Sequence, residues 1–178
     1  MISLSTRTKG DMVNKKVIIL DPRGNTPDYD VPLTKALRER GVDAILFTAY
    51  FYHREKDYDG ELTERRYFFL RLCRRLRRGS FKKRYLKYLS YIVMLPEYVF
   101  DWCRFVLYCI RERPIVHFQW IVFPVIDIAG SFLLKLMGIK IVYTVHNPLP
   151  HDRKGYGNRL VYKIIYSIPD ALIIHSKA

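Results

Sequence analysis

Short apolar runs alternate with amphipathic segments along most of the chain. Residues 16–20 form a β-branched run that stops at the turn-forming residues 21–25, and residues 43–48 form a second such run. Between them, residues 31–40 carry apolar side chains at helical spacing and end at Gly41, which predicts a helix C-cap. This first unit therefore predicts a strand, a helix and a second strand with a right-handed parallel crossover.

The same alternation returns in the second half of the chain. We expect strands at residues 114–118, 139–145 and 170–175, separated by helices at 125–137 and 159–167. Near-continuous apolar strands that alternate with helices indicate a parallel sheet covered on both faces. The predicted fold class is α/β, a Rossmann-like doubly wound parallel sheet of five strands. One domain is expected over residues 16–178, after a flexible N-terminus of residues 1–15.

The charge of the chain changes this picture in one place. The 178 residues carry a formal net charge of +14, with 49% hydrophobic and 27% charged residues. From Arg65 to Arg113 there are 14 Lys and Arg against three acidic residues, so this stretch holds +11 of the total and also 12 aromatic residues. We interpret residues 64–113 as a basic, aromatic helical segment inserted into the α/β frame. The rest of the chain is close to balanced.

The basic segment has an internal helical order. An apolar stripe and a basic stripe lie at helical spacing, which predicts an amphipathic helix. The apolar stripe is Phe69, Leu72, Cys73 and Leu76, and the basic stripe is Arg71, Arg74, Arg75 and Arg78. An apolar, aromatic-rich helix follows and is expected to break at Pro96.

Basic side chains next to aromatic ones suit an anionic lipid surface, because the aromatic rings partition to the level of the headgroups. The candidate membrane-surface residues are Arg71, Arg74, Arg75, Arg78, Lys82, Lys83, Arg84 and Lys87. The same composition suits single-stranded RNA, and an ordinary solvated helix face remains the simplest alternative. The sequence by itself leaves these three interpretations open, with nucleic acid the least favoured.

Candidate chemistry lies just after the strands, because ligands of open parallel sheets bind beyond the carboxyl ends of the strands. Gly24 and Asn25 follow the first strand and could present backbone N–H groups to a phosphate, although by themselves they favour a simple turn that needs a glycine. His146 closes a buried strand, where a histidine can act as a general base, a hydrogen-bond donor or a structural cap. Gln119 and Trp120 end the strand before it and could touch a ligand.

The remaining polar groups give weaker signals. His117 lies within a predicted buried strand on the same face as Gln119, which favours a hydrogen-bonded core histidine. His146, His151 and Asp152 match no strong metal-ligand spacing, so no metal site and no cofactor are expected. Three cysteines without a C-x-x-C pair predict reduced thiols in a cytosolic compartment.

Five stretches of the chain resemble the N-terminal lobe of a family 4 glycosyltransferase. Enzymes of this family have the GT-B fold, which consists of two Rossmann lobes around a cleft. The stretches are Val17–Leu20, Pro32–Gly41, Ile115–Trp120, Gly138–Pro148 and Pro169–Ser176. The most specific are the TVHN motif that contains His146 and the later DALIIHS motif. The resemblance covers most of residues 16–176, apart from the basic segment.

The resemblance implies a division of labour between two lobes. The N-terminal lobe shapes the acceptor site, with His146 as the active-site histidine and with Gly24 and Asn25 approaching the donor phosphates. The acceptor-side residues would be Gln119, Trp120, Asn147, His151 and Asp152. The donor-binding lobe is expected to be absent, because no two glutamates have the E-x7-E spacing of the family and the sequence stops after the fifth strand.

We therefore expect a glycosyltransferase N-terminal lobe that transfers a sugar from a nucleotide sugar to a glycan or lipid-linked acceptor once a second lobe completes it. A separate chain could supply that second lobe. Its expected place is the cytoplasmic face of the membrane, as a peripheral protein. A non-catalytic basic α/β module that binds anionic membranes or nucleic acid is the alternative. A third and weaker hypothesis is a nucleotide-binding Rossmann protein of another class, because the glycine fingerprint of dinucleotide-binding proteins is missing.

Overall fold

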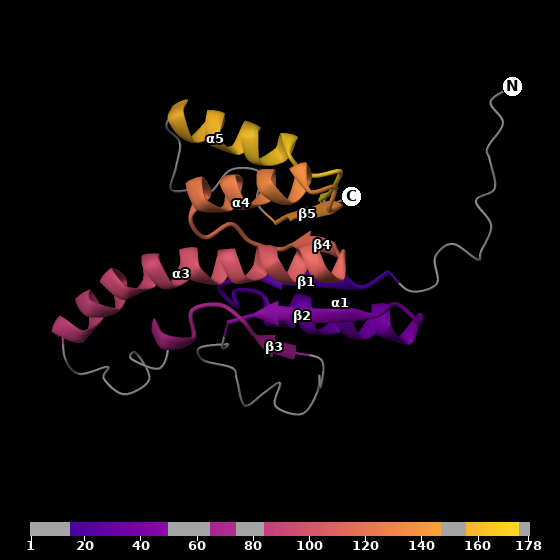
Figure 1. Cartoon of the computed structure of the whole chain (residues 1–178), viewed down its shortest axis with the longest axis horizontal. Coiled ribbons are helices and arrows are strands. Elements are labelled where there is room, and N and C mark those ends of the chain that lie inside the picture. Colours follow the sequence, from indigo (N-terminus) through magenta and orange to yellow (C-terminus); the bar gives the residue numbers. More distant parts are fainter. Residues whose placement is uncertain (1–14, 50–64, 74–83, 147–155, 175–178) are drawn as a thin grey trace, which may run out of the picture.

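The computed structural model describes residues 15–49, 65–73, 84–146 and 156–174. A six-stranded, wholly parallel sheet runs through them, in the order β3-β2-β1-β4-β5-β6 (Figure 1). The strands are β1 Val17–Asp21, β2 Ala44–Thr48, β3 Arg65–Tyr67, β4 Ile115–Phe118, β5 Ile141–Val145 and β6 Ala171–Ile174. The helices are α1 Pro27–Glu39, α3 Arg84–Glu112, α4 Pro124–Leu136 and α5 Tyr156–Ser167. The predicted Rossmann-like α/β class is confirmed.

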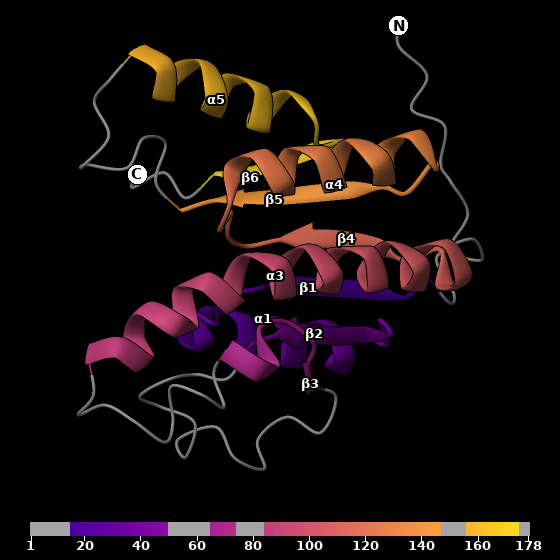
Figure 2. The same cartoon turned by 60° about the vertical axis from the view of Figure 1, so that its left-hand side comes forward.

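The sheet is covered on both faces by helices. Helices α3, α4 and α5 lie together on one face and α1 lies on the other (Figures 1 and 2). The larger core fills the three-helix side, where alternate strand residues such as Ile18, Leu20 and Phe118 meet α3. A smaller cluster of Ile19, Val31 and Leu46 joins β1 and β2 to α1. The alternation of faces along each strand produces this division.

Five of the six strands coincide with the predicted ones, and β3 is the strand that the sequence pattern did not predict. Its residues, Arg65–Tyr67, pair in parallel with Leu46–Thr48 of β2 at the edge of the sheet. A short basic run does not show the apolar pattern of a buried strand, whereas charged residues are common on edge strands. The basic segment therefore contributes one strand to the main sheet.

The prediction that a helix breaks at Pro96 is wrong, because α3 continues through this proline to Glu112. Proline interrupts the backbone hydrogen bonds of a helix, and α3 bends away from the sheet toward its N-terminal end (Figures 1 and 2). Burial of side chains after Pro96 stabilises the helix despite the proline. The buried side chains are Tyr98, Asp101, Trp102, Phe105, Val106 and Cys109.

Only the start of the predicted basic amphipathic helix falls within the described residues. Residues 71–73 are helical, but Leu70 adopts a left-handed φ of 53°, so Phe69 lies before the helix rather than on its apolar stripe. Leu72, predicted on that stripe, is 51% exposed. The reason is the anchoring by α3, whose Asp101 accepts a 2.8 Å hydrogen bond from the N–H of Leu70. Leu76 and the basic residues from 74 to 83 lie outside the described residues.

Helix α1 begins four residues before the predicted start at Val31. Pro27 occupies the first turn, and Asp28 and Asp30 follow it there. A proline at this position and acidic residues in the first turn are favourable signals for a helix start. The correction matters because it places Tyr29 and Asp30 beside the loop that follows β1.

Candidate functional site

The site lies where the strand order reverses. In the order β3-β2-β1-β4-β5-β6, the chain builds outward in one direction from β1 and in the other from β4, so the β1–β4 boundary is the switch point of the sheet. The loops that follow these two strands meet there: the indole Nε1 of Trp120 donates a 2.9 Å hydrogen bond to Thr26 Oγ1. Open parallel sheets bind their ligands at this position.

Asp21 organises the loop after β1. Its buried carboxylate accepts hydrogen bonds of 2.5–3.2 Å from four successive backbone N–H groups, those of Arg23, Gly24, Asn25 and Thr26. Gly24 has a φ of 66°, which glycine adopts without the steric cost that other residues pay. The backbone N–H groups of Gly24 and Asn25, which were predicted to approach a phosphate, donate instead to the Asp21 carboxylate. To bind a phosphate, they would have to give up these hydrogen bonds to Asp21.

Asp30 places a second carboxyl group beside this loop. It is fully buried in the first turn of α1 and accepts a 3.2 Å hydrogen bond from Thr26 Oγ1. Burial, and then the neighbouring Asp21 carboxylate, raise the pKa of Asp30 to about 9. Asp30 is therefore protonated at neutral pH.

His146 lies directly after β5 and is half-buried. Its ring is parallel to that of Trp120, with the centroids 5.0 Å apart and 5° between the planes. The ring of Tyr29 meets His146 edge-on at 5.3 Å. Two aromatic side chains from two different elements thus hold the imidazole, at the edge of the sheet where ligands bind.

A polar chain leads from His146 into the sheet. Its Nε2 is 3.0 Å from Gln119 Oε1, and Gln119 Nε2 is 3.3 Å from Nε2 of His117. The same nitrogen of His117 is 2.7 Å from Thr144 Oγ1. Burial, and secondarily the electrostatic effect of the nearby His146 imidazole, lower the pKa of His117 to about 4, so His117 is neutral at physiological pH. The prediction of a hydrogen-bonded core histidine at 117 is confirmed.

The structure brings together five of the residues proposed from the sequence for sugar transfer: Gly24, Asn25, Gln119, Trp120 and His146. Asn147, His151 and Asp152 lie outside the described residues. Sequence reasoning missed Tyr29 and Asp30, because it started the helix too late, and Thr144, because nothing in a strand pattern marks a hydroxyl as the partner of a histidine. Pro27 was the signal that could have moved the helix start.

No three His, Cys, Asp or Glu side chains form a set of metal ligands in the part of the chain that the structure describes. The arrangement offers instead an imidazole for proton transfer, an indole ring beside it and a polar loop. These groups suit binding and activation of a hydroxyl compound.

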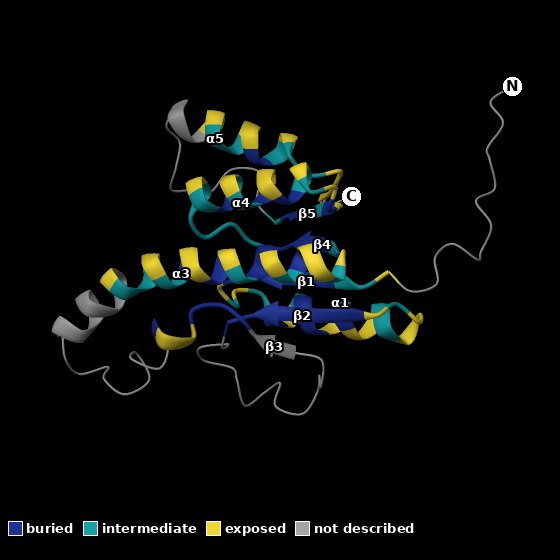
Figure 3. Ribbon diagram, in the orientation of Figure 1, coloured by how far each residue is buried: buried dark blue, intermediate teal, exposed yellow. Residues whose placement is uncertain are grey.

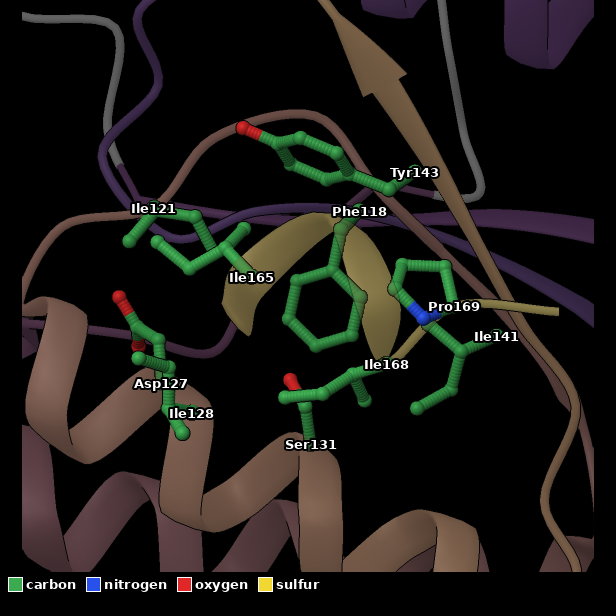
Figure 4. Close-up of a pocket in the computed structure, with 10 residues that line it drawn as sticks. All are labelled: Phe118, Ile121, Asp127, Ile128, Ser131, Ile141, Tyr143, Ile165, Ile168 and Pro169. Carbon is green, nitrogen blue, oxygen red and sulfur yellow. The ribbon is translucent and has the colours of Figure 1, made fainter. Parts of the chain in front are cut away.

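A narrow gap lies on the opposite face of the sheet, between β4, β5, α4 and α5 (Figure 4). Its walls are mainly apolar, and the side chains among them that carry polar atoms are Asp127, Ser131 and Tyr143. The Asp127 carboxylate already has hydrogen-bond partners within the protein, because it accepts hydrogen bonds from Tyr98, Trp102 and two backbone N–H groups. The gap is thus a feature of core packing that is separate from the His146 site.

The outer surface of α3 and α4 is unusually apolar. Exposed side chains recur along both helices on the three-helix side of the molecule, where Figure 3 shows exposed stripes. The side chains with the highest exposed fractions are Ile92, Phe100 and Leu107 on α3 and Val125, Phe132 and Leu136 on α4. Arg71 is also exposed, and Arg84 and Lys87 lie in the first turn of α3. None of the described helices is long and apolar enough to cross a membrane.

Comparisons with known proteins agree with this fold. No family model matches the chain, and no curated protein is similar in sequence. Among solved structures, the crystal structure of Acinetobacter baumannii MurG is similar, with a TM-score of 0.50 and 11% sequence identity over 92% of this chain. MurG is a family 28 glycosyltransferase of the GT-B fold. At this identity the likeness shows a GT-B-like fold, and it gives no support to family 4 in particular. The chain spans 42% of the MurG chain.

Proposed function

We propose that this chain is the acceptor-side lobe of a glycosyltransferase of the family 4 type. It transfers a sugar from a nucleotide-sugar donor to a glycan or lipid-linked acceptor once a donor-binding lobe completes it. The observation that carries the proposal is the position of His146, held by Trp120 and Gln119 at the switch point of a GT-B-like sheet. The likeness of the fold to MurG supports the same class of reaction.

In this reaction the His146 imidazole accepts the proton of the acceptor hydroxyl as that oxygen attacks the anomeric carbon of the donor. The bond from the anomeric carbon to the diphosphate breaks, and the leaving group carries away the negative charge. Gly24 and Asn25, at the start of the loop that leads into α1, are the proposed neighbours of the donor phosphates. Trp120 offers an aromatic surface for the acceptor, together with Asn147, His151 and Asp152 from the following segment.

Replacing His146 tests the catalytic part of the proposal. His146→Ala, assayed with a nucleotide sugar and a candidate second lobe, is expected to lower kcat by about 10²–10⁴-fold, the usual contribution of a general base. Ser131→Ala is the matched control, since Ser131 lies on the other face of the sheet and should leave turnover unchanged. Equal turnover by His146→Ala and the wild-type chain would remove His146 from the mechanism.

A second proposal concerns where the protein acts. We propose that the apolar surface of α3 and α4, together with the basic side chains of residues 64–113, docks the lobe peripherally on the inner face of an anionic membrane. This location would put the lobe next to a lipid-linked acceptor. Exposed apolar side chains enter the interfacial region while basic ones contact the headgroups. Each Lys or Arg near such a surface adds about 1 kcal/mol.

Vesicle flotation tests this docking. Leu107 and Leu136 are 66% and 70% exposed, so Leu107→Gln with Leu136→Gln should fold normally and yet lower binding to anionic vesicles by about tenfold or more. Ala36→Gln, on the exposed side of α1, is the control and should bind like the wild-type chain. Binding that ignored lipid charge, salt and both substitutions would contradict the proposal.

The alternative function is a non-catalytic basic module that binds membranes or nucleic acid. It predicts vesicle or RNA binding with no sugar transfer in any combination of donor and second lobe. The ordered contacts around His146 favour the enzymatic proposal, because a docking module has no use for a supported imidazole at the switch point.

A further inference from the structure

We propose that Thr26 is a positioning residue that fixes the indole of Trp120 at the switch point and presents the ring of Trp120, rather than its N–H group, to the acceptor. This inference rests on the proposed function, in which Trp120 offers an aromatic surface to the acceptor. It adds the residue that holds this surface in place and the part of the indole that the acceptor meets.

The hydroxyl group of Thr26 joins two loops that are far apart in the sequence. Its Oγ1 accepts a 2.9 Å hydrogen bond from the indole Nε1 of Trp120, which lies 94 residues further along the chain. An indole has one N–H donor and no acceptor, so this bond uses the whole hydrogen-bonding capacity of the Trp120 side chain. The aromatic ring is the part that remains for a ligand.

The same hydroxyl does not cap the helix that Thr26 begins. Thr26 is the N-cap of α1, a position at which a threonine oxygen usually accepts a hydrogen bond from an N–H of the first turn. Among the described residues, Thr26 Oγ1 makes no such bond to α1, although the Thr26 carbonyl accepts from the N–H groups of Tyr29 and Asp30. The hydroxyl therefore holds Trp120 instead of stabilising the helix start.

Two buried carboxyl groups hold Thr26 itself in place. Its N–H donates a 3.2 Å hydrogen bond to Asp21 Oδ2, and its hydroxyl donates a 3.2 Å hydrogen bond to Asp30 Oδ2. Both aspartates are fully buried, one at the end of β1 and the other in the first turn of α1. Because the hydroxyl proton is directed at Asp30, the oxygen is left as an acceptor for the indole of Trp120.

The position of Trp120 matters because its ring also supports the proposed catalytic histidine. The rings of Trp120 and His146 lie parallel, with their centroids 5.0 Å apart. An indole that turned about its side-chain bonds would lose this stacking and would present different surfaces to a ligand. Ordering the ring before the acceptor arrives removes part of the entropic cost of binding. Thr26 thus acts on the acceptor through Trp120.

Nitrogen-15 NMR of the indole groups tests the inference on the full chain, without donor or acceptor. The chain has two tryptophans, so Trp120→Phe identifies the Trp120 signal by its loss, and Trp102, whose indole donates to Asp127, is the internal reference. Thr26→Val keeps the shape of the side chain and removes the hydroxyl. Exchange of the Trp120 N–H with solvent should then become about fivefold faster, as expected for loss of one hydrogen bond. Thr26→Ser keeps the hydroxyl and should leave the exchange rate unchanged.

Thr34→Val is the matched control. It removes another hydroxyl from α1, one that donates a 2.7 Å hydrogen bond to the backbone carbonyl of Asp30, and it should leave the Trp120 exchange rate unchanged. A second measurement uses the wild-type chain, in which a nuclear Overhauser effect should join the Trp120 indole N–H to the Cβ proton of Thr26, about 5 Å away or less. Equal exchange rates in the wild-type chain and Thr26→Val, or the absence of this Overhauser effect, would overturn the inference.

Turnover separates this inference from the proposed function. In an active assembled enzyme, Thr26→Val should raise the KM for the acceptor about fivefold and leave the KM for the donor unchanged, and Thr26→Ser should restore the acceptor KM. If this shift appears while His146→Ala keeps full turnover, the positioning role stands and the catalytic role of His146 fails. If His146→Ala loses turnover but Thr26→Val has the acceptor KM of the wild-type chain, the catalytic role stands and this inference fails.

Discussion

At the scale of single residues, the site is a set of buried polar groups whose protonation states depend on one another. Asp21 is satisfied by backbone N–H groups, Asp30 is protonated beside it, and His117 is neutral within the sheet. Each of these states follows from burial together with a specific neighbour. Their common result is a rigid support for His146 and Trp120.

The raised pKa of Asp30 predicts how stability depends on pH. Its folded pKa of about 9 is above the ordinary value of 3.8, so folding favours the protonated form. The stability that it contributes is complete below pH 3.8 and is lost as the pH rises toward 9. The free energy of unfolding therefore falls steadily as the pH rises through this window.

Asp30→Asn should remove this dependence, because an amide keeps a donor and does not ionise. Urea unfolding at pH 5, 6, 7 and 8 measures it: the wild-type chain should lose stability with rising pH, and Asp30→Asn should lose clearly less. Parallel slopes for the two proteins would show that Asp30 is already charged in the folded state.

At the scale of elements, the packing of α3 against α4 is one of the contacts that tie the basic segment to the fold. Gly130 of α4 faces the indole of Trp102 on α3 so closely that a Cβ at this position would lie 2.4 Å from two ring atoms. The same indole donates to Asp127, one turn earlier on α4. Glycine at 130 lets the two helices approach while this buried hydrogen bond forms.

Gly130→Ala should therefore destabilise the protein despite the higher helix propensity of alanine. Overpacking typically costs about 1–3 kcal/mol, and the propensity gain of about 1 kcal/mol offsets only part of it. Thermal unfolding measures the change as a lower Tm. A variant as stable as the wild-type chain, or more so, would show that the helices can separate at no cost.

At the scale of the whole molecule, the sequence predicted the class and most of the order of the fold. Apolar strand runs such as Ile141–Val145 and helix ends such as Gly41 are local signals, and the structure confirms them. The sequence pattern could not predict β3, because this strand depends on pairing with β2. It also could not predict that α3 continues through Pro96, because this depends on the burial of residues farther along the helix. Both are decided by tertiary contacts.

The same difference between local sequence signals and tertiary contacts applies to the candidate site. His146, Gln119 and Trp120 could be found from the sequence because they end predicted strands, where parallel sheets bind ligands. The ring stacking, the Asp21 loop and the link through Gln119 to His117 join residues from different strands and loops, so no spacing in the sequence reveals them.

The most direct test of the central claim is transfer itself. Labelled nucleotide sugars, incubated with this chain, a donor-binding lobe and extracted membrane lipids, should give label in the lipid or glycan fraction only when both lobes and one particular donor are present. Omitting this chain should abolish the product. A donor lobe that transfers its sugar equally well without this chain, or no transfer with any donor and any lobe that binds the chain, would contradict the account.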